Sequence, residues 1–304
     1  MIRHRHAAEV RPSRVVVLGA SGFVGSALVD EMTRLGIETV PLSSRAMDLC
    51  QPESTAALQR ILRQEDVVVM VSAITPDKGK DASTLMRNLA MGQHVSAVLE
   101  EPVCSHVVYI SSDAVYDDAA SLIRETSSCS PSTFHGLMHV GRERMLIQAV
   151  QKSRIPLLVV RPCAIYGAGD SHQSYGPNRF VQAALTDHAI KLFGHGEEKR
   201  DHLYVNDLSR LVGLGLLHGS EGILNAASGT SVSFGDLARL VAELCGEEIR
   251  IEPTPRQHPI THRHVDLAVM RKAFPSFRPT PVRAGLAETL RVLLRDRLEA
   301  PVQR

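Results

Sequence analysis

The sequence lacks several features that mark whole classes of protein. No stretch of it approaches the roughly 18 consecutive apolar residues of a membrane-spanning helix, and it has neither internal repeats nor a low-complexity segment. Its 34 Lys and Arg residues barely exceed its 33 Asp and Glu residues, so the net charge is only +1. These shortages argue against membrane-spanning, disordered and collagen-like chains. They also leave no charge excess for nucleic acid or a membrane surface, so we expect a small-molecule partner.

Cysteines are few and form no motif. They are odd in number and widely spread, with no Cys-x-x-Cys pair: Cys50, Cys104, Cys129, Cys163 and Cys245. This pattern favours reduced thiols in a cytoplasmic protein over a disulfide framework or a zinc site, and we expect no bound metal. Residues 1–13 are basic and polar and lack the apolar region of a signal peptide, so we expect them to form a flexible tail.

A regular alternation of short and long segments follows this tail. The chain has 304 residues, 44% of them apolar, which is enough for a substantial core and for about two domains. Short β-branched runs alternate with amphipathic stretches, and they predict strands at 15–18, 37–42, 67–71, 106–110 and 157–160. Because these runs are apolar throughout, helices are expected on both faces of the sheet. The sequence therefore predicts an α/β fold with a Rossmann-type, doubly wound parallel sheet.

The pattern changes after Gly167, where Gly, Ser and other polar residues become frequent. We expect residues 14–170, with about 203–227, to form the larger domain that holds the parallel sheet. Residues 171–202 and 228–304 would form a smaller C-terminal domain over the carboxyl edge of that sheet. Helices are predicted at 207–217, 234–244 and 281–294, with Ser233 as the N-cap of the second.

A glycine-rich loop joins the first strand to the first helix. It reads Gly19-Ala20-Ser21-Gly22-Phe23-Val24-Gly25, directly after residues 15–18. Glycines permit a tight turn and a close approach of the backbone, so a pyrophosphate can sit on the helix N-terminus, where amide N–H groups favour anions. We expect this loop to bind a dinucleotide through Gly19, Ser21, Gly22, Phe23, Val24 and Gly25.

The end of the second strand bears on which dinucleotide is bound. An NAD site usually offers an acidic residue there to the ribose hydroxyls. This chain has Leu42-Ser43-Ser44-Arg45 instead, without a carboxylate. Ser44 and Arg45 suit a 2′-phosphate, which favours NADP and leaves NAD as the alternative. Arg45 is also compatible with a solvated side chain or with stacking on adenine.

Four motifs occur in a fixed order along the chain: Gly19-x-x-Gly22-x-x-Gly25, Ser111-Ser112-Asp113-Ala114-Val115-Tyr116, Arg161-Pro162-x-x-Ile165-Tyr166-Gly167 and Arg200-Asp201-His202-x-x-Val205-x-Asp207. From residue 14 to 294 the chain thereby resembles the extended short-chain dehydrogenase/reductase family, the NAD(P)-dependent epimerases, dehydratases and reductases of nucleotide sugars. The resemblance implies hydride transfer at a sugar carbon and a nucleotide-sugar substrate in the C-terminal domain. It also implies a homodimer formed through helices around 86–99 and 134–150.

The family also implies a catalytic Ser or Thr and a Tyr-x-x-x-Lys pair on the following helix. Ser112 matches the Ser/Thr position, and Asp113 follows it as in members that dehydrate or reduce 4-keto sugars. The chain departs from the family at the pair, because His135 stands where Tyr is expected and His139 where Lys is expected. Imidazole can give and take a proton near neutral pH, and two residues at i, i+4 share one helix face.

Three interpretations of this pair are open. In the first, His135 is the catalytic acid and base, assisted by Asp113, and His139 orients the cofactor ribose. In the second, the protein is a catalytically reduced relative that binds NAD(P) or a nucleotide sugar as a sensor or partner subunit. In the third, the histidines belong to a metal site. This last one is disfavoured, because no Glu lies inside the spacing and no third ligand follows.

Further ligand contacts are expected at the ends of strands, where doubly wound sheets bind their ligands. For the cofactor these are Asp48, Leu49, Ser72, Ala73, Ile74, Asn88, Ser111, Pro162, Cys163 and Ala164. We interpret Cys163 as a small buried thiol rather than a nucleophile, because no base is paired with it. By resemblance, the diphosphate of the substrate would be bound by Asn178, Arg200 and Arg256.

Overall fold

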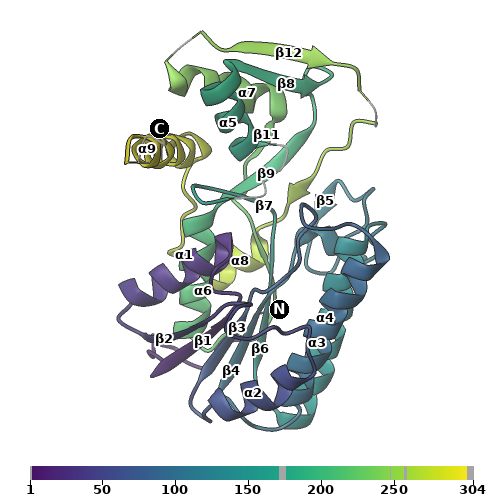
Figure 1. Ribbon diagram of the computed structural model, residues 1–304, viewed down its shortest axis with the longest axis vertical. Coiled ribbons are helices and arrows are strands. Elements are labelled where there is room, and N and C mark those ends of the chain that lie inside the picture. Colours follow the sequence, from purple (N-terminus) through teal and green to yellow (C-terminus); the bar gives the residue numbers. More distant parts are fainter. Residues whose placement is uncertain (1, 171–175, 247, 257–258, 300–304) are drawn as a thin grey trace.

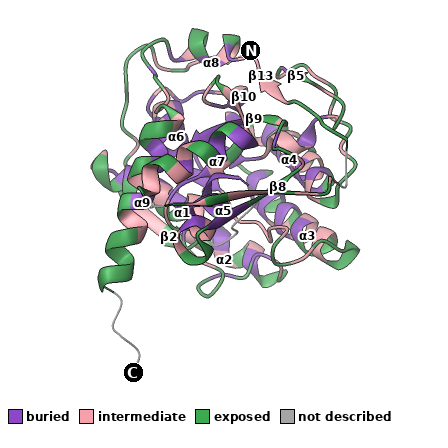
Figure 2. Ribbon diagram, turned by 90° about the horizontal axis from the view of Figure 1, so that it is seen from above, coloured by how far each residue is buried: buried purple, intermediate pink, exposed green. Residues whose placement is uncertain are grey.

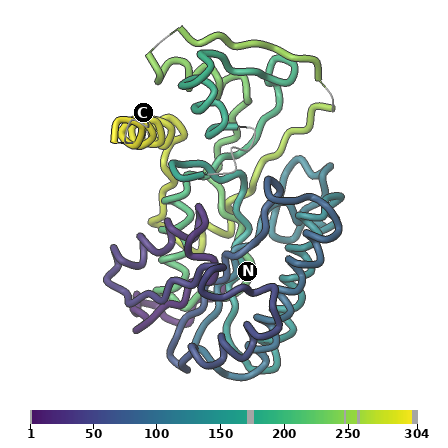
Figure 3. The backbone as a smooth tube through the Cα atoms, in the orientation of Figure 1, coloured from purple at the N-terminus to yellow at the C-terminus, as the bar shows by residue number. Residues whose placement is uncertain are grey.

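The computed structural model describes residues 2–170, 176–246, 248–256 and 259–299. In Figure 1 a large sheet flanked by helices forms the lower part of the molecule, and smaller sheets with further helices form the upper part. The chain passes between the two parts several times, as the trace in Figure 3 shows. The expected domain boundary at 170–171 and the last residues, 300–304, fall on or beside residues outside the described ranges.

The central sheet has six parallel strands, which confirms the predicted doubly wound fold. Its strand order is β10-β6-β4-β3-β1-β2. These strands are β1 (Arg14–Leu18), β2 (Glu38–Leu42), β3 (Val67–Met70), β4 (His106–Ile110), β6 (Leu157–Pro162) and β10 (Gly222–Ala226). The order reverses between β1 and β3, because β2 lies on one side of β1 and β3 on the other. Ligands of such sheets bind outside the carboxyl ends of the strands at this point.

Alternate residues of each strand enter different cores. Val15 and Val17 join the cluster on one face, whereas Val16 and Leu18 join the cluster on the other, as the period of two in a strand requires. The first face is covered by α1 (Phe23–Arg34), α6 (Val205–Leu217) and α8 (Ala268–Ala273). The second face is covered by α2 (Glu53–Ile61), α3 (Ala82–Leu99) and α4 (Phe134–Ser153). Figure 2 shows the buried residues gathered between these layers.

The upper part contains a third core, around Phe180, Leu237 and Leu286. Its helices are α5 (Pro177–Asp187), α7 (Phe234–Cys245) and α9 (Val282–Glu299). Its strands are β7 (Ala164–Tyr166), β8 (Ala189–Phe193), β9 (Lys199–Tyr204), β11 (Ser231–Ser233) and β12 (Arg250–Thr254). The Ser233 hydroxyl accepts a hydrogen bond from the Asp236 N–H, which confirms it as the N-cap of α7. The short elements η1 (Asp113–Val115), β5 (Leu122–Ile123) and β13 (His264–Val265) lie between the two parts.

Two segments pack differently from what the sequence suggested. Residues 2–10 lie against the end of α6 and the start of β10 instead of fraying. Their N–H groups bind carbonyls that α6 leaves unpaired at its C-terminus, such as Val10 N–H to Leu217 O at 2.8 Å. Residues 267–277, expected in the smaller domain, bury Leu267, Met270 and Phe274 in the core beside β10 instead. These residues occupy one helical face, and only the folded chain shows which core that face meets.

No helix of the described ranges is both long and apolar enough to cross a membrane. The five cysteines carry free thiols.

Candidate active site

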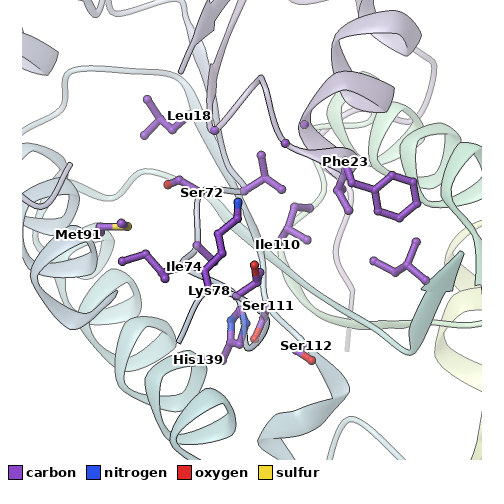
Figure 4. A pocket seen from close by; sticks show the side chains of 18 of the residues that line it. Leu18, Phe23, Ser72, Ile74, Lys78, Met91, Ile110, Ser111, Ser112 and His139 are labelled. Carbon is purple, nitrogen blue, oxygen red and sulfur yellow. The ribbon is translucent and has the colours of Figure 1, made fainter. Parts of the chain in front are cut away.

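A cavity of about 1010 Å³ lies at the carboxyl edge of the central sheet. Figure 4 shows side chains from the glycine loop, from the ends of β3 and β4 and from α4 around it. Most of the expected cofactor and catalytic residues line it: Gly19, Ser21, Gly22, Phe23, Val24, Gly25, Ser44, Asp48, Leu49, Ser72, Ala73, Ile74, Ser111, Ser112, Asp113, His135, His139, Pro162, Cys163 and Ala164. Arg45, Asn88, Asn178, Arg200 and Arg256 are not among the described lining residues.

The glycine loop is shaped by close backbone contacts. Gly19 has a φ of +97°, which favours glycine, and its N–H donates to the Leu42 carbonyl at 2.8 Å. A Cβ at Gly25 would lie 2.1 Å from the Gly19 carbonyl oxygen, so a side chain there would push α1 away from β1. Gly22 is the N-cap of α1, and no side chain caps this helix end. The first amide N–H groups of α1 are therefore available to an anion in the cavity.

The part of the cavity beside the end of β2, where the sequence predicts the cofactor's 2′-phosphate, differs in detail from the expectation. Ser44 lines it, whereas the exposed Arg45 does not. Arg87 of α3 lines it instead, near Asp48. A hydrogen bond from the Cys50 backbone N–H lowers the pKa of Asp48, and the positive charge of Arg87 lowers it further by a smaller amount. The structure thus places a cation and an ionised carboxylate together on this wall.

Ser112 and Asp113 lie at the turn after β4. The Ser112 hydroxyl oxygen accepts a hydrogen bond from the Ala114 N–H at 3.1 Å, which leaves the hydroxyl proton to be donated elsewhere. Burial raises the pKa of Asp113, and the positive charges of Arg263 and Arg200 oppose that rise. The nearest contact between the Arg263 guanidinium and the Asp113 carboxylate is 3.8 Å.

His135 and His139 face one another on the first turns of α4. Their ring centroids are 4.8 Å apart and the ring planes are nearly perpendicular, at 88°. Nδ1 of His139 lies 2.7 Å from the Tyr109 hydroxyl oxygen on β4. Burial lowers the pKa of His139 well below its usual value, and the neighbouring His135 and Arg142 lower it further. His139 is therefore neutral at physiological pH, unlike the lysine that the family pattern would place there.

A buried polar network supports the turn after β4 from behind. Ser111 donates from its hydroxyl to Glu143 at 2.6 Å, and Arg161 forms an ion pair with the same carboxylate at 2.6 Å. Arg161 also donates to the Tyr116 hydroxyl at 2.9 Å, and Tyr116 donates to Asn225 at 2.6 Å. The motif residues Tyr116 and Arg161 thus fix the position of Ser111 on the cavity wall.

Asn88 stands one layer behind the cavity wall. Its side chain exchanges two hydrogen bonds with the backbone of Ile74, at 2.8 and 2.9 Å. Asn88 therefore contacts the loop that lines the cavity, and its direct contact with the cofactor stays a prediction. The donor and the acceptor of this buried amide thus both have partners, as buried polar groups require.

The three residues expected to bind the substrate diphosphate are held by protein groups. Asn178 accepts from the Gly167 N–H at 3.1 Å and donates to Asp170 at 2.5 Å. Arg256 pairs with Glu197 at 2.5 Å and with Glu198 at 3.3 Å. Arg200 bonds the carbonyl and the hydroxyl of Thr261 and contacts Glu198 at 3.4 Å. These hydrogen bonds and ion pairs hold loops of the upper part of the molecule in place.

Cys163 lines the cavity as a buried thiol. Burial raises its pKa well above the usual value, and the nearby Asp201 carboxylate adds to the rise. A protonated thiol is a poor nucleophile, which agrees with the interpretation of Cys163 as a small packing residue. In the described ranges, no cluster of three or more His, Cys, Asp or Glu residues is arranged to hold a metal ion.

Residues 15–227, the part of the chain that builds the sheet and this cavity, match the model of the NAD dependent epimerase/dehydratase family. The chain belongs to this family. The match covers more than half of the sequence and includes the glycine loop, the Ser112 turn and the two histidines. The family resemblance noted from the four motifs is thereby confirmed.

Known proteins similar to this member of the family differ in activity. A dTDP-4-dehydro-6-deoxy-D-allose reductase of Streptomyces bikiniensis is 28% identical over 91% of this chain and 95% of its own. A UDP-N-acetylglucosamine 4-epimerase of Methanobrevibacter ruminantium superposes with a TM-score of 0.81 at 19% identity, over 94% of this chain and all of that one. A GDP-l-fucose synthetase of Naegleria fowleri, bound to NADP, reaches 0.84 at 15% identity, over 98% of each chain. At these identities the two structures show the shared fold.

Several residues at or behind the site were missed from the sequence, and four of them matter most for its charge and hydrogen bonding. Lys78 and Arg87 line the cavity, while Tyr109 and Arg142 contact its wall from within the core. A signal existed for Lys78, because it lies in a Pro-Asp-Lys-Gly turn just after a strand that ends at the cavity. Tyr109 and Arg142 lie in a strand and a helix whose patterns fit ordinary packing, so nothing in the sequence singled them out.

Proposed function

We propose that this protein binds a nicotinamide dinucleotide in the cavity and transfers hydride at a sugar carbon of a nucleotide sugar. The observation that carries the proposal is that one cavity is lined by the glycine loop, Ser112 and the histidines of α4. The loop fits a dinucleotide, since its uncapped helix end and the absent side chain at Gly25 leave backbone donors facing the cavity. When bound, the nicotinamide would accept or supply the hydride.

In this proposal His135 moves the proton that accompanies the hydride. Its imidazole takes a proton from a sugar hydroxyl, or gives one to a carbonyl oxygen, at the position where the family has tyrosine. The Ser112 hydroxyl, already accepting from the Ala114 N–H, donates to the same sugar oxygen. His139 is held by Tyr109 and orients the cofactor ribose and the His135 ring. Asp113 assists His135 by taking up or releasing a proton.

The proposed substrate class is a nucleotide sugar, and the reaction is an epimerisation, a dehydration or a 4-keto reduction. The Streptomyces relative named as a dTDP-4-dehydro-6-deoxy-D-allose reductase covers nearly the whole chain, which supports a reductase acting on a keto sugar. Asn178, Arg200 and Arg256 remain the proposed residues for the diphosphate. For Arg256, phosphate oxygens would take the place of the glutamates that it pairs with here.

We propose NADP as the preferred cofactor, with NAD as the alternative. Ser44 and Arg87 on the cavity wall supply a hydroxyl and a guanidinium suited to a 2′-phosphate.

We also propose a cytoplasmic homodimer. Dimer formation is supported by exposed apolar side chains on α3 and α4, namely Met86, Phe134 and Leu137. Sedimentation of the purified protein as a monomer at micromolar concentration would contradict this part of the proposal.

The test is product formation with a panel of UDP-, dTDP-, GDP- and CDP-sugars and their 4-keto forms. Each is incubated with NAD(H) or NADP(H), and products are identified by mass spectrometry and NMR. We expect turnover with at least one sugar and its loss in His135→Phe, with cofactor binding retained in that variant. Unchanged turnover in His135→Phe would exclude His135 as the acid and base.

The second candidate is a binding protein without turnover. It is favoured by the neutral His139 in place of a permanent cation, because the family's proton transfer relies on a positive charge beside the phenol. Tight dinucleotide binding, with a redox state that no sugar in the panel changes, would support this candidate over the enzyme.

A further inference from the structure

A lysine from outside α4 reaches into the candidate active site. Lys78 lies on the β3–α3 loop, residues 71–81, and lines the same cavity as Ser111 and His139. In Figure 4 its side chain points into the cavity, and its nitrogen lies toward Ser72. The side chain thus runs from the level of the histidines toward the glycine-loop side of the cavity.

The charges on the described lining are unevenly distributed. Two cations line the cavity, Lys78 and Arg87, against four carboxylates: Asp48, Asp77, Asp113 and Asp170. Arg87 stands near Asp48, at the proposed adenosine end. A dinucleotide pyrophosphate carries two negative charges, so its binding among these carboxylates calls for a positive charge in the middle of the cavity. Lys78 is the cation placed there.

The base of the β3–α3 loop is fixed by buried hydrogen bonds. Asn88 holds the backbone of Ile74 through both of its polar groups. Arg142, whose side chain is fully buried, donates to the Ser72 carbonyl at 2.7 Å and to the Asn88 carbonyl at 2.7 Å. The strand end that carries Lys78 is therefore tied to α3 and to α4, the helix of the two histidines.

The tip of the loop is shaped by a turn and a close contact. The Lys78 N–H donates to the Thr75 carbonyl at 2.8 Å, which closes a turn. A Cβ at Gly79 would lie 2.2 Å from the Thr84 hydroxyl oxygen, so glycine lets this turn pack on the start of α3. Thr84 is itself held by the Asp81 side chain through two hydrogen bonds. The loop thus presents Lys78 from a defined backbone position.

The direction of the side chain identifies what it faces. Ser72 packs directly on the glycine loop, since a Cβ at Gly19 would lie 2.7 Å from the Ser72 Cα. The ammonium group that points toward Ser72 therefore faces the place where the glycine loop would hold a pyrophosphate. We propose that Lys78 binds the pyrophosphate of the dinucleotide. This inference rests on the proposed dinucleotide-binding function.

The test compares three variants of the full chain: Lys78→Met, Lys78→Arg and Lys80→Met. Lys80 is the matched control, because it is an exposed lysine of the same loop that does not line the cavity. Binding of NADPH, ADP-ribose and adenosine is measured by calorimetry, at about 20 mM and about 300 mM salt. We expect Lys78→Met to weaken NADPH and ADP-ribose binding about tenfold at low salt and less at high salt, with adenosine unchanged. Lys78→Arg should retain most of the affinity, and Lys80→Met should match the wild type.

The outcomes separate this inference from the proposed function. If the wild type binds dinucleotide and Lys78→Met binds as tightly as Lys80→Met, the role of Lys78 is overturned while the proposed function stands. An equal loss of adenosine affinity would also overturn it, because the variant would then have damaged the pocket as a whole. If the wild type binds neither NADPH nor ADP-ribose, both the proposed function and the role of Lys78 fail.

Discussion

The Tyr109 hydroxyl on β4 and Nδ1 of His139 on α4 are 2.7 Å apart in the core behind the candidate active site. Burial raises the pKa of Tyr109 to about 12, with Arg142 opposing, and burial lowers that of His139. Both groups are therefore neutral at physiological pH. With the Arg142 cation beside the tyrosine oxygen, the phenol O–H is directed to Nδ1, which leaves the proton of the imidazole on Nε2. His139 would then present an N–H donor from a fixed ring.

Replacing Tyr109 with Phe should test this arrangement. The change leaves Nδ1 of a buried imidazole without its partner, so we expect the free energy of unfolding to fall by about 1–3 kcal/mol. We also expect turnover to fall while dinucleotide affinity changes little, because the ring of His139 loses its orientation but keeps its place. Urea denaturation measures the stability, calorimetric titration measures the dinucleotide affinity, and the product assay measures the turnover. Unaltered stability together with unaltered turnover would show that the contact positions nothing.

Gly25→Ala should disrupt both folding and dinucleotide binding. The added Cβ would lie 2.1 Å from the Gly19 carbonyl oxygen, so α1 must shift away from β1, at a cost of about 3 kcal/mol. Gly22→Ala is the matched control for stability, since its Cβ would make an ordinary 3.5 Å contact and its φ of −80° suits any residue. Denaturation of the two variants should differ clearly. Equal stability would mean that the loop adapts to the larger residue.

The buried ion pair at the start of β1 should be important for stability. Arg14 contacts Asp66 at 2.5 and 2.8 Å, and the Arg63 N–H binds the same carboxylate at 2.8 Å. Asp66→Asn would leave a buried guanidinium uncompensated, so we expect a loss of about 3–5 kcal/mol. Glu243→Gln, which breaks the exposed pair with Arg283, should cost less than about 1 kcal/mol. Similar losses in the two variants would contradict this difference.

Two buried histidines should make the protein sensitive to acid. Burial lowers the pKa of His106 and that of His202 to about 4, so the folded state keeps both rings neutral. Well above pH 6.5 both rings are neutral in the folded and the unfolded chain. The protonation of these histidines then takes nothing from the free energy of unfolding. As the pH falls from about 6.5 through 4, the unfolded chain takes up protons first and stability is lost, by up to about 3 kcal/mol per histidine.

The measurement is urea denaturation between pH 4 and 8 for the wild type and for His106→Gln, whose side-chain amide can still donate to the Ser220 carbonyl. The free energy of unfolding of the variant should fall less between pH 6.5 and 4 than that of the wild type. The exposed His195→Gln serves as the control variant. A pH dependence in His106→Gln identical to that of the wild type would rule out His106 as a source of it.

The choice between NADP and NAD should depend on Arg87 more than on Arg45. Arg87 lines the cavity beside Asp48, whereas Arg45 lies outside its described lining. We expect the wild type to bind NADPH more tightly than NADH. Arg87→Met should reduce that preference about tenfold, and Arg45→Met should change it less than twofold. Fluorescence titration with both cofactors measures these ratios. The reverse ranking would place the 2′-phosphate at the end of β2.

The sequence alone determined the architecture and most of the cavity lining. Apolar runs at strand length, separated by amphipathic stretches, leave little choice other than a parallel sheet covered on both faces. Glycines at 19, 22 and 25 between a strand and a helix reveal a ligand loop because their spacing is local. Residues at the ends of parallel strands, such as Ser72 and Ser112, meet at one edge, so their presence at the site also follows from order along the chain.

Only the tertiary structure decided which residues stand behind and across that site. The period of two sends Tyr109 to one face of β4, but the helix packed on that face is set by topology, and α4 brings His139 there. Lys78 enters the cavity because buried contacts with Asn88 and Arg142, 14 and 70 residues along the chain from their partners, fix its loop. Such contacts depend on which residues meet in the folded chain, and a pattern of neighbouring residues does not reveal this.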